Sequence, residues 1–487
     1  MAWTSCAGSR LGSLVFLLLL MATEQQAQTL IARQSVERMI ADQFIDESQD
    51  QSYFFTLYKN RLNEISSLDM VDIPKGKTWK YNLPEDHYWV GVHHYAQQLS
   101  LVLVQYAINL DSVYFKELIY QPGEGWKESR SIGALVYNSK NRKPKFRLLE
   151  QGDFVGVVSD QATYWSKEII TLLWKKEDNH LTGMMGMQWK LPMAESTLSL
   201  ERWQMDGRGN FWLMSGNNRQ TYPKLDLSQL VKTELIHLNV AKKHAQQWDL
   251  VLGPRSLREV FFLPQSEDLI RCICTFSNSG KEEIDGTVIY DLSVSQENVV
   301  RQRVINMEVP VSGVPWIAKT VMSDSLGGFW IWGEEYYYKE VRSMDRVNGQ
   351  PTGPVTVQYQ EYFEDIYGWH IEKEMSEIDT AVVLPKKQVG AELDGPSFGV
   401  SWQHGPVIRF NDHSSSQPEK GEAREWSGQR TVVREYRQVG KEWKSTAKEM
   451  SSLSERGNGH VLRLPLEVSD GHVGIFLSGN YFLICTE

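Results

Sequence analysis

Short stretches of this sequence repeat a turn that is followed by an aromatic strand. The repeats are DGRGNFWLMSG (206–216), DSLGGFWIWG (324–333) and, more loosely, DGHVGIFLSG (470–479). In each repeat Asp and Gly form a tight turn, an apolar run containing aromatic residues follows, and Gly ends the run. A second phrase, Gln-x-Gly-x-x-Trp-Lys, occurs at 121–127 and again at 438–444. Recurrence of one small β unit is typical of folds that stack similar sheets in an array or a ring.

The region after Tyr81 has the punctuation of an all-β fold. Runs rich in Val, Ile, Tyr, Phe and Trp are interrupted by Gly, Asn, Asp or Pro about every ten residues. In a ring of four-stranded sheets, each sheet buries its faces against its neighbours, which explains why the turn and the aromatic strand recur together. At about 40 to 50 residues for each blade, this region holds roughly six or seven blades. The sequence therefore predicts a six- or seven-bladed β-propeller, with the repeated Trp at the seam between blades, and a pair of β-sandwiches is the alternative.

The N-terminus is typical of an export signal. Arg10 gives it a positive start, 11–22 form an apolar run, and Ala22 or Ala27 offers a small residue for cleavage. The run is shorter than the roughly 20 apolar residues that a membrane span needs. We therefore predict a signal peptide at 1–27, the secretory pathway as the route, secretion, and no membrane anchor after signal removal.

The stretch 28–80 is predicted to be a lead-in segment with a short helix, and 81–487 are assigned to the propeller. The lead-in prediction rests on apolar residues that partly follow helical spacing, namely Leu30, Ile31, Met39, Ile40 and Phe44.

Composition limits the partners. The net charge is −10, with 61 acidic and 51 basic side chains, which argues against nucleic acid as a partner. The 17 Trp and 20 Tyr residues supply large flat side chains. Neutral or apolar small molecules, or sugars, fit this composition better.

Three cysteines follow the predicted signal. In an oxidising compartment Cys485 is expected to form a disulfide with either Cys272 or Cys274, which leaves one thiol unassigned. A Cys-x-Cys pair alone has too few ligands for a zinc site. No metal is expected.

The usual catalytic motifs do not occur in the sequence. It contains no His-Glu-x-x-His and no Gly-x-Ser-x-Gly, and Gly76-Lys77-Thr78 lacks the upstream Gly of a phosphate loop because Val71 stands there. His93 and His94 would point to opposite faces of a strand, so we interpret them as a satisfied surface pair. No cofactor is expected.

The last complete unit has a specific strand order. It reads GPSFGVSWQHGPVIRF (395–410) and then, after a polar loop, TVVREYRQVGKEWKS (431–445). This order resembles the repeat of the fungal fucose-specific lectins, six-bladed propellers in which Arg and Glu hold a sugar between blades and aromatic residues cover its apolar face. The resemblance implies that Arg409, Glu435 and Trp443 form a sugar site. A guanidinium fork, a carboxylate and an indole suit sugar binding, and a structural cross-strand Arg–Glu pair is the alternative.

The pattern is incomplete in other units. In the first one Glu117 and Trp126 occupy the matching positions, but Val102 stands where Arg is expected. Arg271 restores an Arg without correctly spaced Glu and Trp partners. Few sugar sites are therefore intact.

The chain also resembles the secreted fungal hetero-Diels–Alderases of tropolone sesquiterpenoid biosynthesis in architecture, length and export signal. Members of that family join a tropolone ortho-quinone methide to a humulene-type sesquiterpene. The resemblance implies a cofactor-independent pericyclase of fungal secondary metabolism that acts on apolar small molecules. Such a reaction needs two partners held in a reactive pose, a hydrogen-bond donor near the carbonyl and an aromatic wall that excludes water.

The cyclase hypothesis implies particular residues. Arg409 and His404 are the candidate catalytic donors, with Arg271 as a further candidate. The candidate aromatic wall consists of Trp402, Trp443, Trp126, Trp330 and Trp332. Packing between blades is the alternative role for each of these tryptophans.

Three functions therefore stay open at this point. A cyclase predicts one deep, mostly apolar cavity with one or two donors. A lectin that binds a fucosylated glycan predicts several equivalent, exposed Arg–Glu–Trp pockets around the ring. A scaffold would instead bind another protein through one face of the propeller.

Overall fold

The computed structural model covers the 487-residue chain. The residues it describes are 29–35, 40–48, 51–60, 64–73, 75–95, 98–107, 111–121, 125–127, 130–136, 144–159, 168–177, 180–190, 203–216, 233–250, 256–277, 284–307, 316–343, 346–347, 350–351, 356–374, 377–389, 398–402, 405–417, 431–440, 442–449, 461–468, 471–478 and 481–486. Their regular structure is entirely β, and none of them belongs to a helix that could span a membrane.

The described strands form eight sheets of four or five strands, which we call blades 1 to 8. Blade 1 consists of β2 (Ile40–Ser48), β3 (Gln51–Lys59), β4 (Ile65–Asp72) and β5 (Lys77–Asn82). Blade 2 consists of β6 (His87–His94), β7 (Leu99–Tyr106), β8 (Ser112–Gln121), β9 (Gly125–Trp126) and β10 (Arg130–Val136). Blade 3 consists of β11 (Phe146–Gln151), β12 (Phe154–Ser159), β13 (Glu168–Glu177) and β14 (His180–Lys190). Blade 4 consists of β15 (Trp203–Met205), β16 (Phe211–Gly216), β17 (Thr233–Asn239) and β18 (His244–Leu250).

The second half of the chain continues the series. Blade 5 consists of β19 (Ser256–Ser266), β20 (Leu269–Ser277), β21 (Gly286–Ser293) and β22 (Asn298–Asn306). Blade 6 consists of β23 (Trp316–Ser323), β24 (Phe329–Ser343), β27 (Thr356–Ile371), β28 (Ile378–Leu384) and β29 (Gln388–Val389), and a separate pair is formed by β25 (Arg346–Val347) and β26 (Gln350–Pro351). Blade 7 consists of β30 (Gly399–Trp402), β31 (Pro406–His413), β32 (Thr431–Val439) and β33 (Glu442–Glu449). Blade 8 consists of β34 (Val461–Val468), β35 (Gly471–Ser478), β36 (Tyr481–Thr486) and β1 (Thr29–Ser35).

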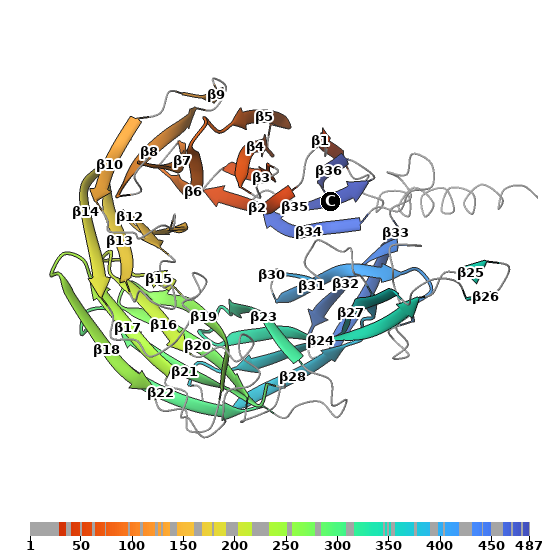
Figure 1. Cartoon of the computed structure of the whole chain (residues 1–487). Coiled ribbons are helices and arrows are strands. Elements are labelled where there is room, and N and C mark those ends of the chain that lie inside the picture. Colours follow the sequence, from red (N-terminus) through yellow and green to blue (C-terminus); the bar gives the residue numbers. More distant parts are fainter. Residues whose placement is uncertain are drawn as a thin grey trace, which may run out of the picture.

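The blades are arranged round a common centre (Figure 1). β1 pairs antiparallel with β36, so the first described strand completes the last blade. Blade 8 contacts blade 7 through β34 and β30, and it contacts blade 1 through β1 and β5, which closes the ring. The first strands of successive blades, such as β6, β11 and β15, contact one another and face the centre, whereas strands such as β14, β18 and β22 lie at the periphery.

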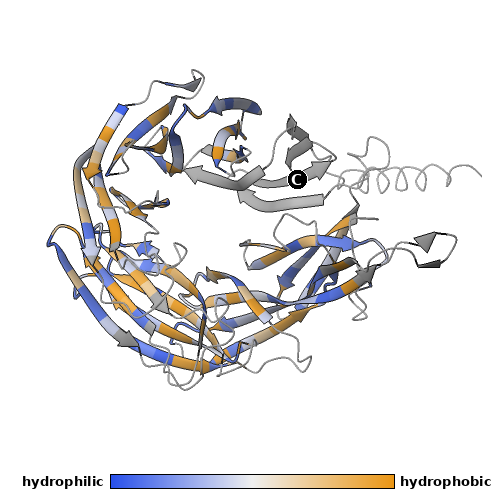
Figure 2. Ribbon diagram, in the orientation of Figure 1, coloured by the Kyte–Doolittle hydropathy of each residue, from blue (hydrophilic) through white to orange (hydrophobic). Residues whose placement is uncertain are grey.

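The cores lie in the seams between blades. Each apolar cluster in the described part of the chain draws its side chains from two neighbouring blades. The seam between blades 2 and 3, for example, joins Val102 and Phe115 to Val157 and Trp174. Hydrophobic positions recur along the strands of successive blades (Figure 2). Because a blade has two faces and each packs on a neighbour, no single blade has a core of its own.

The propeller prediction is confirmed, and the sandwich alternative is wrong. The described ring has eight blades where six or seven were predicted, because seven blades draw strands from the region after Tyr81 and blade 1 precedes it. The structure corrects the lead-in predicted for 28–80, because its described residues form β1 to β5. Tyr53, Phe54 and Phe55 are all buried, so successive side chains face both seams as they do in an inner strand. The predicted signal at 1–27 lies outside the described residues.

The structure also corrects the disulfide prediction. Cys272 and Cys274 are buried free thiols on β20, with their Sγ atoms 3.6 Å apart. Cys485 belongs to β36 of blade 8, and β20 belongs to blade 5, so the two strands do not share a sheet. Because both thiols of β20 are free, neither forms the predicted bridge to Cys485.

Candidate functional site

Arg409 and Glu435 form a cross-strand ion pair in blade 7. They lie directly opposite each other on β31 and β32, and the Arg409 Nε atom donates to Glu435 Oε2 over 2.8 Å. Arg437 Nη2 donates to the other carboxylate oxygen over 3.0 Å. Burial acts to raise the pKa of Glu435, but the charges and hydrogen bonds of the two guanidinium groups outweigh it and lower that pKa. The pair has the geometry of the structural alternative, and a sugar-binding role for it stays a prediction.

Trp443 lies on the opposite face of the same blade. It is opposite Gln438 on β32, and residues 435 and 438 point to opposite faces because side chains alternate along a strand. Trp443 packs with Ile408 and Tyr436 in the seam with blade 6. One ligand cannot contact all three predicted residues of this site.

Three predicted tryptophans meet in that seam. The rings of Trp330 and Trp332 are stacked with centroids 5.0 Å apart, and Trp443 meets Trp332 edge-on at 5.7 Å. Trp332 is fully buried, and a Cβ atom on Gly368 would come within 2.3 Å of its ring. The predicted role of the repeated Trp at a blade seam is confirmed here.

This seam role of Trp443 gives a direct prediction. Trp443→Ala is expected to lower the free energy of unfolding by about 2 kcal/mol, because a half-buried indole loses its contacts with two tryptophans. Trp443→Phe is expected to cost about half as much, and exposed Lys444→Ala almost nothing. Urea unfolding followed by circular dichroism measures all three. Equal stability of wild type and Trp443→Ala would contradict the assignment.

In blade 2, Glu117 and Trp126 likewise point to opposite faces of the sheet. Trp126 contacts Tyr81 and Tyr120 in the seam with blade 1, which confirms its predicted place. Glu117 points to the other face, alongside Phe115. The duplicated phrase thus marks two tryptophan corners in one ring.

The Glu117 carboxylate is fully buried and holds blade 2 together. Its Oε1 atom accepts hydrogen bonds from His93 Nε2 at 3.1 Å, from Ser100 Oγ at 2.7 Å and from the Tyr95 hydroxyl. Its Oε2 atom accepts from Arg130 Nε at 2.6 Å. Burial acts to raise the pKa of Glu117, but these hydrogen bonds and the His93 charge lower it to about 2.

Arg130 supplies the guanidinium that the sequence pattern lacks at Val102. Val102 lies opposite Glu117 on one side, and Arg130 lies opposite it on the other. The sequence pattern did not indicate Arg130, because it places the Arg on the strand before the Glu and Arg130 lies on a strand after it. The sequence analysis also placed His93 on the surface, whereas His93 is fully buried, since β6 presents this face to the next blade. His94, half-buried, points to the other face as predicted.

Arg271 has a carboxylate partner as well. Its Nε atom donates to Asp291 Oδ1 over 2.8 Å, and the two residues are opposite each other on β20 and β21. Its Nη1 atom donates to the carbonyl of Gly327 in blade 6 over 3.4 Å. Arg271 therefore ties blade 5 to the neighbouring turn. His404 lies outside the described residues, as does the side chain of Trp402.

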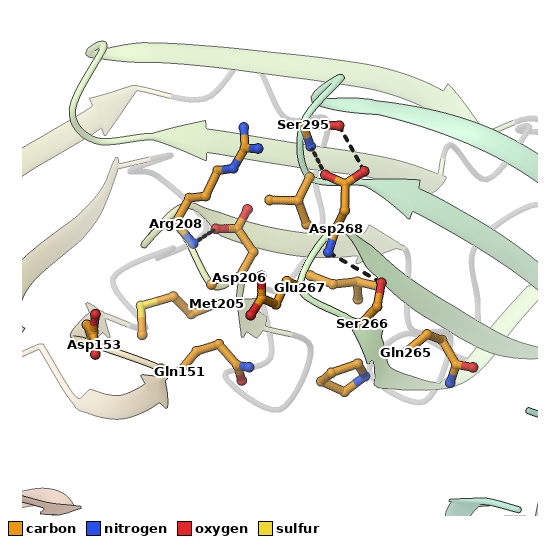
Figure 3. Close-up of a pocket in the computed structure, with 15 residues that line it drawn as sticks. Gln151, Asp153, Met205, Asp206, Arg208, Gln265, Ser266, Glu267, Asp268 and Ser295 are labelled. Carbon is orange, nitrogen blue, oxygen red and sulfur yellow. Dashed lines mark hydrogen bonds between the residues drawn. The ribbon is translucent and has the colours of Figure 1, made fainter. Parts of the chain in front are cut away.

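A cavity of about 890 Å³ lies where turns of three blades meet. It is lined by turns of blades 3, 4 and 5, within 151–153, 205–208, 264–270 and 294–295 (Figure 3). Among the residues that line it, Asp153, Glu267 and Asp268 are exposed carboxylates, and Arg208 is exposed and cationic. Acidic charge therefore exceeds basic charge at this cavity.

The repeated Asp-Gly turn forms one wall. Asp206 is buried, and its Oδ1 atom accepts the backbone N–H groups of Arg208 at 2.9 Å and Asn210 at 3.0 Å. Its Oδ2 atom accepts from Trp212 Nε1 at 3.0 Å. Asp324 holds the corresponding turn of blade 6 through two backbone N–H groups in the same way. Such side-chain bonds to the backbone fix the shape of a tight turn.

A second turn is fixed by Asp268. Its carboxylate accepts the backbone N–H of Ser295 at 2.6 Å and the Ser295 hydroxyl at 2.8 Å. These hydrogen bonds lower the pKa of Asp268. Glu297 lies in the same β21–β22 turn as Ser295. Its Oε1 atom accepts hydrogen bonds from Lys242 Nζ at 2.6 Å and from Asn239 Nδ2 at 3.0 Å, which link blades 4 and 5.

The described residues hold no group of three or more His, Cys, Asp or Glu side chains that could bind a metal ion. The cavity itself was missed by the sequence analysis. Its signal was present, because Asp206 belongs to a repeated turn, but the repeat was interpreted only as a hairpin. Adjacency of turns from three blades appears only in the folded ring.

No protein-family model matches the chain, and no curated protein matches it. Its fold is similar to that of solved β-propellers. The Dos1 propeller is 8% identical with a TM-score of 0.47, over 94% of this chain and 95% of that one. The β-propeller domain of the Trilobed protease from Pyrococcus furiosus is 7% identical with a TM-score of 0.37, over 86% of this chain and 99% of that one. The likeness concerns the fold alone.

Proposed function

We propose that the protein is a binding protein whose cavity takes a cationic segment of another protein, one that carries Arg or Lys side chains. The observation that supports this best is the set of exposed carboxylates around one cavity, with Asp153 on a turn of blade 3 and Glu267 and Asp268 on a turn of blade 5. Guanidinium and ammonium groups pair with carboxylates through charge-assisted hydrogen bonds. This proposal is the scaffold hypothesis, and it assigns the binding surface to the face of the ring that carries the cavity.

The size and rigidity of the cavity support binding. A volume of about 890 Å³ lies in the range of ordinary ligand sites and has room for a few side chains. Asp206 is held by its own turn and Asp268 by Ser295 of the β21–β22 turn, so the lining needs little reorganisation when a ligand enters. Hydrogen bonds from Ser295 favour the ionised form of Asp268. A cation would therefore meet negative charge that is already in place.

The test uses peptides of fixed charge. An Arg-Gly repeat peptide is expected to bind in calorimetry at low salt, and a Glu-Gly repeat of equal length is not. The double variant Asp153→Asn/Glu267→Gln is expected to weaken binding about tenfold, since it removes two exposed carboxylates from the lining. Raising the ionic strength should weaken it further, because screening acts most on exposed charges.

A matched control neutralises two exposed carboxylates elsewhere. Glu85 precedes blade 2 and Glu442 begins β33 of blade 7, and both are exposed. Glu85→Gln/Glu442→Gln removes the same net charge and is expected to leave binding unchanged. Equal loss in both double variants would mean that the peptide senses only net charge, and the cavity proposal would then be wrong.

The hetero-Diels–Alder cyclase and the fucose-binding lectin stay predictions from resemblance. Each has its own test. Incubation with a quinone methide precursor and humulene would reveal a cyclase if product yield or stereochemistry differs from the protein-free reaction. Retention on a fucose column would reveal a lectin. Secretion also stays a prediction, and N-terminal sequencing of the mature protein tests it.

A further inference from the structure

A buried histidine lies beside the cavity wall. His237 on β17 is opposite Trp212 on β16 and opposite Gln246 on β18. It is fully buried, and its ring lies 4.3 Å from the Trp212 ring, centroid to centroid, at 37°. Both ring nitrogens are buried without a hydrogen-bond partner among the described residues. A buried polar group without a partner calls for an explanation.

Two chains of contacts connect His237 to the cavity. On one side Trp212 donates to Asp206, which holds the turn that includes Arg208, and both Asp206 and Arg208 line the cavity. On the other side, Asn239 follows His237 by two residues on β17 and donates a hydrogen bond to Glu297. Glu297 lies in the β21–β22 turn, whose first residues, Val294 and Ser295, line the cavity. The histidine thus lies behind two of the turns that shape the site.

Burial favours the neutral form of this ring. It lowers the pKa of His237, and it outweighs the carboxylates of Asp206 and Glu297, which act in the opposite direction. His244 and Lys242 add to the lowering. In the part of the chain that the structure describes, these four charged or titratable groups have the largest influence on the ring, and they lie in the β15–β16 turn, the β17–β18 turn, the start of β18 and the β21–β22 turn.

Protonation would place two N–H donors and a positive charge in this site. The nearby carboxylates, Asp206 and Glu297, already accept hydrogen bonds that fix the cavity turns. A protonated His237 could form an ion pair with either carboxylate only if that carboxylate gave up its present hydrogen bonds. Alternatively, it could be hydrated only if the seam between the blades opened. Each outcome disturbs a turn that lines the cavity.

We propose that His237 is an acid-sensitive latch beside the cavity, so that acidification loosens the lining turns and releases the ligand. This inference rests on the proposed binding function of the cavity. In the unfolded chain His237 has the ordinary histidine pKa of about 6.5, whereas in the folded chain its pKa is lower. Stability from His237 is therefore complete above about pH 6.5 and is lost as the pH falls below that value.

The experiment compares pH 7.5 with pH 5.5. Binding of the Arg-Gly peptide to the wild type is expected to weaken at least about tenfold on acidification, and less than about threefold in His237→Phe. The peptide keeps its charge over this range, and so do ordinary carboxylates. The matched control is His244→Gln, which removes an exposed histidine near the same site and is expected to behave as the wild type does.

Hydrogen exchange gives a readout that needs no peptide. The amide protons of Arg208 and Asn210 are bonded to Asp206, so their protection factors should fall on acidification in the wild type and not in His237→Phe. His237→Gln repeats the test without a larger ring, in case the Phe variant does not fold.

The outcomes separate the two proposals. No peptide binding at pH 7.5, with the exchange difference present, would reject the binding function and keep the latch. An identical pH response of wild type and both His237 variants, in binding and in exchange, would overturn the latch even if the peptide binds.

Discussion

Replacement of Glu117 by Ala is expected to lower the free energy of unfolding by about 3 to 5 kcal/mol, because it removes the centre of a buried network. The substitution leaves His93, Tyr95 and Ser100 without the acceptor that they share, and it leaves Arg130 without its carboxylate. Buried donors without an acceptor each carry a desolvation cost. Urea unfolding at pH 7, followed by circular dichroism, measures the loss.

Two further variants and a pH series test the cause. Glu117→Gln keeps one acceptor oxygen and is expected to cost about half as much, and Arg130→Ala about 1 to 2 kcal/mol, since the Arg130 side chain is 37% exposed. The folded-state pKa of Glu117 is about 2, below its ordinary 4.5. Its contribution is therefore complete above about pH 4.5 and is lost as the pH falls toward 2. A loss under about 1 kcal/mol in Glu117→Ala would contradict a central role for the network.

Local signals explain why the propeller was predictable. The Asp-Gly turn of 206–209 and the aromatic strand after it are specified within about ten residues, and such local patterns survive in the sequence. The two tryptophan corners were predictable for the same reason, because Trp126 and Trp443 follow similar turns. Blade 1 was not recognised, since β2 and β3 carry no such turn and apolar residues near Ile40 imitate helical spacing.

The candidate site depended on information that one strand does not carry. Glu435 and Trp443 point to opposite faces of blade 7 because side chains alternate between the two faces along β32 and because the register with β33 places Trp443 opposite Gln438. The sequence contains the residues but not that register. Arg130 became visible as a partner only when strand order was known, because β10 lies on the side of β8 away from β7. Asp291 lies opposite Arg271 as Glu435 lies opposite Arg409, but the sequence pattern called for Glu at that position. The cavity requires turns of blades 3, 4 and 5 to be neighbours, which is a property of the ring.

The second large effect is expected from a buried ion pair in blade 6. Lys386 and Glu334 are both fully buried, and the Lys386 ammonium group donates to Glu334. Burial lowers the pKa of Lys386, and the Glu334 charge opposes this change. The ammonium group also lies 5.6 Å from the Phe363 ring centroid and 5.7 Å from that of Phe398. Lys386→Met is expected to lower the free energy of unfolding by about 3 to 5 kcal/mol, because the partly exposed Lys319, 3.5 Å from Glu334 Oε1, compensates the buried carboxylate less well than the buried Lys386 does.

The double variant gives the sharper result. Lys386→Met/Glu334→Leu removes both charges and is expected to fall within about 1 kcal/mol of the wild type, since well-packed apolar residues replace a buried pair at little cost. The coupling energy from the cycle of single and double variants should then exceed about 2 kcal/mol. Lys387→Met, at the adjacent half-buried position, is the matched control and is expected to change little. Additive losses in the two single variants would show that Lys386 and Glu334 stabilise the blade independently and not as a pair.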